Sequence, residues 1–219
     1  GGNITYTYDA DTIYLGPSRI ATAETYVEFE GRTDYFDQSR LPFHVTTSDW
    51  QESDRVFAGV LTALKSRTAP IDIGGYGAFD GVTLGELRRP RIEGKFSGER
   101  MRAFDVVWGA VNGDAIIENN YTDVTNAIVR AGDSAIFVEG RFSLGYPRGD
   151  GGEEINARIR LIRRPLSDLK HAFELDDYHV DGQFSGEFHV YGNYLMPLGF
   201  GQMAIVEGVA YGEPFETAP

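Results

Sequence analysis

Short stretches in which apolar and polar residues alternate run along most of this chain, and they restrict its fold more than any other feature. In EINARIRLIR (154–163), Ile155, Ile159 and Leu161 fall on one face of an extended chain, and arginines fall on the other. Similar stretches recur, and glycine with Asp or Asn separates them about every ten residues. The sequence therefore predicts a mainly all-β fold of many short strands, each with one apolar and one polar face.

Two stretches depart from this alternation and have helical spacing instead. Ser48–Ser66 carries apolar residues three and four positions apart. Ser48 with Gln51 also matches a capping box, in which each side chain bonds a free backbone N–H at the helix start. Arg164–Leu175 has one apolar helical face, with Pro165 in its first turn. We expect two short amphipathic helices among the strands.

The chain repeats several features in the same order, which indicates an internal duplication. Glu-Gly-Arg occurs at 30–32 and again at 139–141, and Gly-x4-Pro occurs at 85–90 and at 192–197. One expected helix lies between these anchors in each half. We therefore expect residues 1–219 to form a single segment built of two related repeats, at about 20–108 and 128–212.

Composition argues against several classes of function. The chain has no cysteine, so thiolate metal ligands, disulfides and cysteine nucleophiles are excluded. Its net charge of −13 disfavours nucleic acid as a partner, because the chain offers no positively charged surface to neutralise phosphates. Hydrophobic residues make up 42% of the 219 residues, which is enough for a sizeable core.

Candidate catalytic and metal-binding groups are sparse. None of the four histidines has a metal-ligand spacing, and His44 and His189 fall on the polar side of their strands. The neighbouring acids Glu153 and Glu154 point to opposite faces of a strand, so they cannot flank one scissile bond. The Gly-rich stretch at 74–81 lacks the Lys-Ser/Thr of a phosphate loop. We expect no enzyme, no cofactor and no metal, and a catalytic pair assembled from distant acids stays open as the alternative.

The ends of the sequence suggest a piece of a larger protein. The chain begins GGNITYTY without an initiator Met, and it contains neither a signal peptide nor an apolar run of about eighteen residues. We expect an interior fragment whose membrane anchor or export signal lies elsewhere.

The apolar strand faces allow two interpretations. They could close on each other as the core of an ordinary sandwich or barrel. Alternatively, one long curved sheet could leave its inner face open to acyl chains, since each buried CH2 stabilises such a complex by roughly 0.8 kcal/mol. Periodicity alone does not separate these interpretations.

Two long stretches resemble the TamB/AsmA-like family of bacterial envelope proteins. They are ATAETYVEFEGRTDYFDQSRLPFHVTTSDWQESDRVFAGV (21–60) and IGGYGAFDGVTLGELRRPRIEGKFSG (73–98), and the resemblance covers most of residues 20–208. In that family a strand ending in glycine precedes an lpf-v motif, a helical segment and a run of glycines with proline. The matching positions are Gly75, Phe79, Gly81, Gly85, Pro90 and Gly94, then Gly182, Gly186, Gly192, Pro197 and Gly201.

This resemblance implies a fold, a function and partners. The fold would be a U-shaped antiparallel or mixed β-sheet, a β-taco, whose apolar groove holds phospholipid acyl chains. The function would be phospholipid transport across the periplasm for outer-membrane biogenesis. An inner-membrane anchor outside this fragment and an Omp85-type outer-membrane barrel would be its partners.

We therefore predict a non-enzymatic segment of a periplasmic lipid conduit, with the helices around Trp50 and Phe173 lying against the groove as covers or plugs. The predicted lipid-binding residues are Val27, Phe29, Phe43, Val45, Phe104, Val106, Trp108, Ile136, Val138, Ile155, Ile159, Leu161, Phe188 and Val190.

Two rival functions remain. An open sheet edge could receive strands of outer-membrane proteins, which would make the protein a chaperone or scaffold for their assembly or translocation. A closed β-sandwich with exposed aromatic residues could instead bind extracellular glycans.

Overall fold

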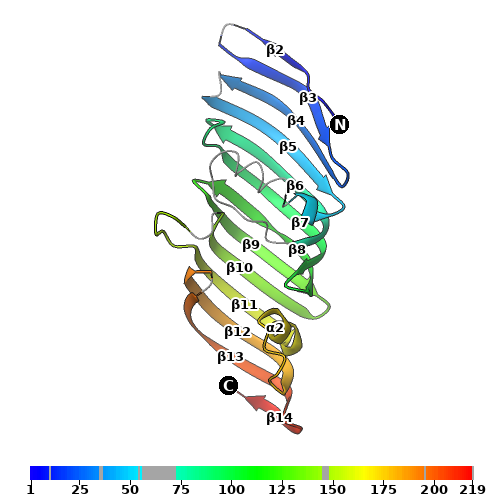
Figure 1. Ribbon diagram of the computed structural model, residues 1–219, viewed down its shortest axis with the longest axis vertical. Helices are drawn as coiled ribbons and strands as arrows, with labels where there is room; N and C mark the ends of the chain where they lie inside the picture. The colour runs from blue at the N-terminus through cyan, green and yellow to red at the C-terminus, as the bar shows by residue number, and fades with distance from the viewer. Residues whose placement is uncertain are drawn as a thin grey trace.

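The computed structural model describes residues 1–9, 11–34, 37–53, 55, 73–144, 148–194 and 196–218. Within these residues, 14 strands form one curved, open, antiparallel sheet (Figure 1). The strands are β1 (Gly2–Asn3), β2 (Tyr6–Tyr8), β3 (Ile13–Ala21), β4 (Thr25–Asp34), β5 (Gln38–Thr47), β6 (Gly74–Gly85), β7 (Arg91–Ala103), β8 (Val106–Glu118), β9 (Tyr121–Ala131), β10 (Ser134–Ser143), β11 (Ile155–Pro165), β12 (Val180–Asn193), β13 (Met196–Ala210) and β14 (Glu213–Ala218).

The topology is a meander, because each strand from β3 to β14 pairs with the strand that follows it in the chain. The short strands β1 and β2 both pair with β3, as two halves of one edge. Figure 1 shows the strands in chain order from the N-terminus at the top to the C-terminus at the bottom. This arrangement confirms the prediction of a curved all-β sheet. The closed sandwich is wrong for the described residues, which form one sheet instead of two packed layers.

The second helix, α2 (Leu166–Ala172), follows β11 directly, with Pro165 at its N-cap. Its leucines Leu166 and Leu169 pack against a core cluster of Ile136, Leu161 and Phe184 on the sheet. This confirms the predicted helix over a shorter span. Phe173 was expected to share its apolar face, but it caps the C-terminus of α2 and is 70% exposed.

The first helix begins at Trp50, and residues 50–53 and 55 are its described part. The remainder of the predicted span, up to Ser66, lies outside the described residues. The cap differs from the predicted capping box, because the Asp49 carboxylate accepts the Gln51 N–H at 3.0 Å. The Ser48 hydroxyl instead donates to the Glu24 carboxylate on the neighbouring β-turn. Asp49 therefore begins the helix one residue later than the sequence pattern indicated.

Candidate functional site: an apolar trough

A row of apolar and glycine residues crosses eleven neighbouring strands, from β3 to β13, joined by hydrogen-bond register except at a β-bulge where Gly113 lies against Ala127. Residues opposite each other in adjacent strands lie on the same face, so the row is a continuous strip. Ten strand spacings of about 4.8 Å make it roughly 50 Å long. The row comprises Ile20, Val27, Val45, Phe79, Phe96, Gly113, Ala127, Val138, Ile159, Phe188 and Gly201.

Three further rows run beside the first on the same face, and none of the residues in these four described rows is charged. The second row is Ser18, Phe29, Phe43, Gly81, Gly94, Ala115, Val124, Gly140, Ala157, Val190 and Gly199. The third row is Thr25, Thr47, Gly77, Gly98, Val111, Val129, Ile136, Leu161, Gly186 and Met203. The fourth row is Leu41, Thr83, Ile92, Ile117, Thr122, Phe142, Ile155, Gly192 and Pro197. We call this face the apolar trough.

The trough lies on the inside of the sheet's curve. Ala157 is only 1% exposed, and Ala115 and Ala127 are also buried. In the part of the chain that the structure describes, no second sheet covers them. Small side chains on an uncovered sheet are buried in this way only if the sheet curls around them. The trough is therefore the concave face, with its aliphatic walls turned toward each other.

Aromatic rings lie across glycines on the floor of the trough. Phe43 and Phe79 stack with ring centroids 5.7 Å apart and planes 7° apart. A Cβ atom on Gly81, the residue opposite Phe43, would approach both rings within 2.6 Å. Phe184 and Phe188 stack in the same manner on β12, at 5.9 Å and 6°. The glycines make room for flat rings, so the floor around them is smooth and apolar.

Thirteen of the fourteen predicted groove residues lie on this face or at its edge. Val106 and Trp108 stand at the start of β8, where Trp108 packs against the core cluster and Val106 is buried. The four rows contain the other eleven: Val27, Phe29, Phe43, Val45, Ile136, Val138, Ile155, Ile159, Leu161, Phe188 and Val190.

Phe104 is the exception, and its predicted place in the groove is wrong. It lies in the turn between β7 and β8 and is 68% exposed. Phe104 and Asp105 both have positive φ, at 53° and 59°, as the two central residues of a tight hairpin turn do. The alternation in FDVVWG extends two residues beyond the strand, because a turn can continue an apolar pattern by chance.

The sequence reasoning missed several trough residues, among them Phe79 and Phe96. Both stand in glycine-rich stretches, GGYGAFDG and GKFSGE, where glycine usually signals a turn. The period-two spacing of glycine and phenylalanine was the available signal, because glycine occupies an inward position in these strands whenever a ring lies over it.

One charged residue, Arg164, lies on the trough side of the sheet. It pairs with Phe184, which belongs to the core cluster, and it is 1% exposed. A β-bulge between Leu161 and Arg164 shifts the alternation by one residue, with Arg163 at φ 49°. The guanidinium lies over the Trp108 ring, 4.9 Å from its centroid. The sequence pattern gave no warning of this, since the neighbouring arginines face outward.

The opposite face of the sheet is charged across β3–β8 and carries exposed apolar side chains on β13, among them Leu198 and Phe200. One register row reads Arg19, Glu28, His44, Asp80, Lys95 and Asp114. His44 Nδ1 lies 2.5 Å from the Asp80 carboxylate. Arg141 donates to both carboxylate oxygens of Asp123 at 2.7 and 2.8 Å. These charges keep the convex face in water.

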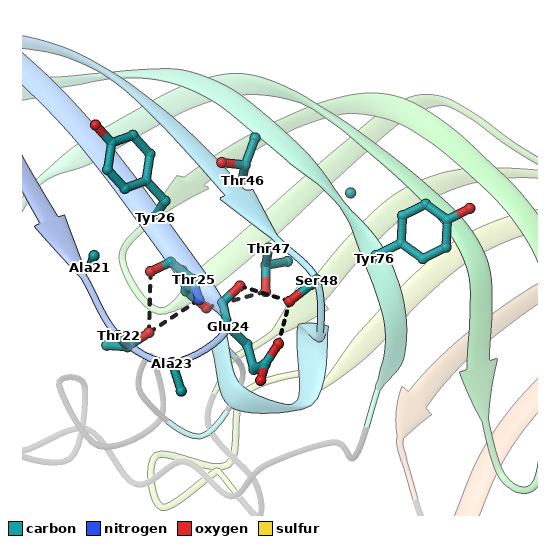
Figure 2. A pocket seen from close by; sticks show the side chains of 11 residues that line it. Ala21, Thr22, Ala23, Glu24, Thr25, Tyr26, Thr46, Thr47, Ser48 and Tyr76 are labelled. Atoms are coloured by element: carbon teal, nitrogen blue, oxygen red, sulfur yellow. Dashed lines mark hydrogen bonds between the residues drawn. The ribbon is translucent and has the colours of Figure 1, made fainter.

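The rim of the sheet carries a depression of about 530 Å³ at the turn between β3 and β4 (Figure 2). Thr22, Thr25 and Ser48 contribute hydroxyl groups to its lining. Beside it, the Glu52 carboxylate accepts the Thr22 hydroxyl at 2.6 Å and the Glu24 N–H at 3.0 Å. The Thr22 hydrogen bond is the main reason that the pKa of Glu52 is lowered. These hydrogen bonds of Glu52 attach the first helix to the rim beside the depression.

The described residues include no group of three or more His, Cys, Asp or Glu side chains placed to hold a metal ion. Nor does any helix among them have the length and apolarity needed to cross a membrane. No family model, curated protein or solved structure matches this chain.

Proposed function

We propose that this protein is a non-enzymatic segment of a hydrophobic conduit, in which the apolar trough holds the acyl chains of phospholipids. The observation that carries the proposal is the uncharged row from Ile20 to Gly201, which crosses eleven strands without a break. A strip roughly 50 Å long is longer than one acyl chain needs, so it suits passage along the sheet better than storage at one point.

The chemistry of the walls supports sliding. Burial of each CH2 contributes roughly 0.8 kcal/mol, which is enough to draw a chain out of water. The rows offer aliphatic, aromatic and glycine surfaces, and their only polar side chains are the uncharged hydroxyls of Ser18, Thr25, Thr47, Thr83 and Thr122. A chain therefore meets similar contacts at each step and finds no strong anchor. The charged convex face keeps such a sheet soluble between two membranes.

The resemblance to TamB/AsmA-like proteins supplies the cellular setting of the proposal. In that setting the segment stands in the periplasm and carries phospholipids between the inner and outer membranes during outer-membrane biogenesis. An Omp85-type barrel is the outer-membrane partner that this resemblance proposes.

The test is to count lipids bound to protein purified from a bacterial periplasm, by mass spectrometry of an organic extract. Ile159→Asp places a charge in the central row, opposite Val138 and Phe188. Ile162→Asp is the matched control, since Ile162 lies on the same strand with its side chain 36% exposed. We expect phospholipid near stoichiometry in the parent and the control, and a marked loss in Ile159→Asp. Unchanged lipid in a folded Ile159→Asp protein would refute the trough as the binding site.

A second function is favoured by the edge of β13. β14 pairs only with residues 205–210 of β13, so residues 196–204 pair with β12 on one side and have no strand on the other among the described residues. An extended segment of an outer-membrane protein could pair there by β-augmentation. Crosslinks from such a client would map to β13 and not to the trough, which separates a scaffold from a conduit.

A further inference from the structure

Arg164, at the end of β11, links α2 to β8, the strand that lies three places from β11 in the sheet. Its Nη1 donates to the Trp108 carbonyl at 3.0 Å, and its Nη2 donates to the Val107 carbonyl at 3.2 Å. Nη2 also lies 2.7 Å from the carboxylate of Asp168 in α2. One buried guanidinium therefore ties the helix, the end of β11 and the start of β8 together.

These contacts require a local closure of the sheet. β9 and β10 separate β8 from β11, and three strand spacings of about 4.8 Å span roughly 14 Å in a flat sheet. An arginine side chain is too short to cross that distance, so the sheet must curl here. The curl brings Trp108 over the core cluster of Ile136, Leu161 and Phe184, on which α2 rests.

The helix depends on few contacts. It is seven residues long, too short to be stable in isolation, and none of its residues is fully buried. Leu166 and Leu169 supply its apolar packing, and Asp168 supplies its ion pair. A buried arginine that loses its carboxylate is left as an uncompensated charge, so this ion pair strongly favours the closed position.

We propose that α2 is a hinged lid over the deepest part of the trough, and that the Arg164–Asp168 ion pair is its latch. Opening frees the helix while the strands stay paired, because the sheet has its own hydrogen bonds and α2 adds none to them. The open form uncovers Leu161 and Phe184, the part of the third row and its border that α2 covers. If the trough binds acyl chains, as proposed above, the closed lid withholds the third row at β10–β12 from them.

Amide hydrogen exchange of the whole chain tests the lid without any lipid. We expect the α2 amides to exchange faster than those of β11 and β12 in the parent protein. In Asp168→Asn their protection should fall further, by about tenfold or more, because the latch is a buried ion pair. Asp176→Asn is the control. Asp176 lies just after α2 and forms an exposed ion pair with His171 in the helix, so its loss leaves Arg164 untouched. Protection of α2 equal to that of the strands in both proteins would overturn the proposal.

A second variant keeps the test decisive if Asp168→Asn does not fold. Leu169→Ala leaves every charge in place and removes half of the lid's leucine packing. We expect the same selective loss of α2 protection, with exchange in β4–β6 unchanged. Loss of protection along the entire sheet would mean that α2 is an integral part of the core, and the lid would be refuted.

A fatty acid with a photoreactive acyl chain then tests what the lid controls. In the parent we expect labelling around Phe29 and Phe43, and in Asp168→Asn additional labelling at Leu161 and Phe184. Identical labelling of the two proteins at all four positions contradicts the lid's control of the trough. Absence of labelling in both proteins contradicts the proposed function, and the exchange experiment then decides the lid by itself.

Discussion

The Phe79 ring occupies the space that a side chain on Gly94 would need: a Cβ atom there would lie 2.5 Å from the ring edge. Phe79 and Gly94 stand on neighbouring strands, β6 and β7, one row apart. The same Cβ atom would also come within 2.5 Å of the Asp80 carbonyl oxygen. The trough floor is therefore built from pairs in which an aromatic ring on one strand lies over a glycine on the next strand.

Replacement of Gly94 by alanine should destabilise the fold. A new methyl group would have to displace both a ring and the backbone, which costs about 1–3 kcal/mol in a well-packed site. Urea denaturation followed by circular dichroism measures this change. Gly149→Ala is the control, because nothing lies within 4 Å of its added Cβ. A Gly94→Ala protein as stable as the parent would show that the ring moves aside freely.

Phe104→Asp should leave the stability of the fold nearly unchanged, whereas Val106→Asp should lower it. Phe104 is exposed at a positive φ, a conformation that Asp adopts more readily than most residues, so stability should change by no more than about 0.5 kcal/mol. Val106→Asp buries a carboxylate without a partner and should cost more than about 2 kcal/mol. Thermal unfolding of the two variants, side by side, compares the costs. Equal losses of stability in the two variants would show that the Phe104 side chain is as important to packing as the buried Val106 side chain.

Glu154 fastens two loops on the rim opposite α2, and its loss should be costly. Its carboxylate accepts the Arg148 N–H at 3.0 Å and the Tyr194 N–H at 2.8 Å, and the residue is buried. In Glu154→Gln an amide NH2 must face one of these donors, which we expect to cost about 1–3 kcal/mol. Glu153→Gln serves as the exposed neighbour in the same urea titration. A shift in midpoint no larger than that of Glu153→Gln would argue against the fastening.

Alkaline pH should weaken the protein through Tyr194. Burial raises the pKa of its hydroxyl from 10.0 to about 12, and the hydroxyl donates to the Ser143 carbonyl only while it is protonated. The unfolded chain therefore loses this proton at lower pH than the folded chain. The contribution is fully present below pH 10 and is lost as the pH rises toward 12.

The measurement for Tyr194 is the unfolding midpoint between pH 9 and 12 in the parent and in Tyr194→Phe, which has no proton to lose there. We expect a smaller decline in the variant. Tyrosinate absorbance should also show, in the parent, one tyrosine that ionises at a higher pH than the others, and this tyrosine should be missing from the variant. Parallel declines would place the pH sensitivity elsewhere.

The sequence predicted the strands and their faces well where side chains alternate. Val45, Ile159 and Val190 are examples, since alternation reports directly which side of a strand is buried. It failed where backbone conformation intervenes. The turn at Phe104 continued an apolar pattern, and Arg164, predicted to begin the helix, instead lies in β11, where the bulge at Arg163 turns it toward the trough. Neither positive φ nor an inserted residue leaves a periodic signal.

The candidate site was harder to predict than the fold. The four rows depend on register across many strands, and register is set by turn geometry and bulges that alternation does not contain. The latch at Arg164 depends on contacts with Val107 and Trp108, far away in the chain. The glycine and phenylalanine pairs are visible in the sequence, but only the packing shows that their spacing belongs to one floor.

Because every strand from β3 onward pairs with its sequence neighbour, the length of this sheet is an additive property of the chain. One more hairpin would extend the trough by two strand spacings, about 9.6 Å, and would leave the existing pairs unchanged. Each new pair also closes only a short loop, which permits the strands to fold in order as the chain emerges. The length of such a sheet can therefore change in evolution by one hairpin at a time, while the rest of the sheet keeps its pairing.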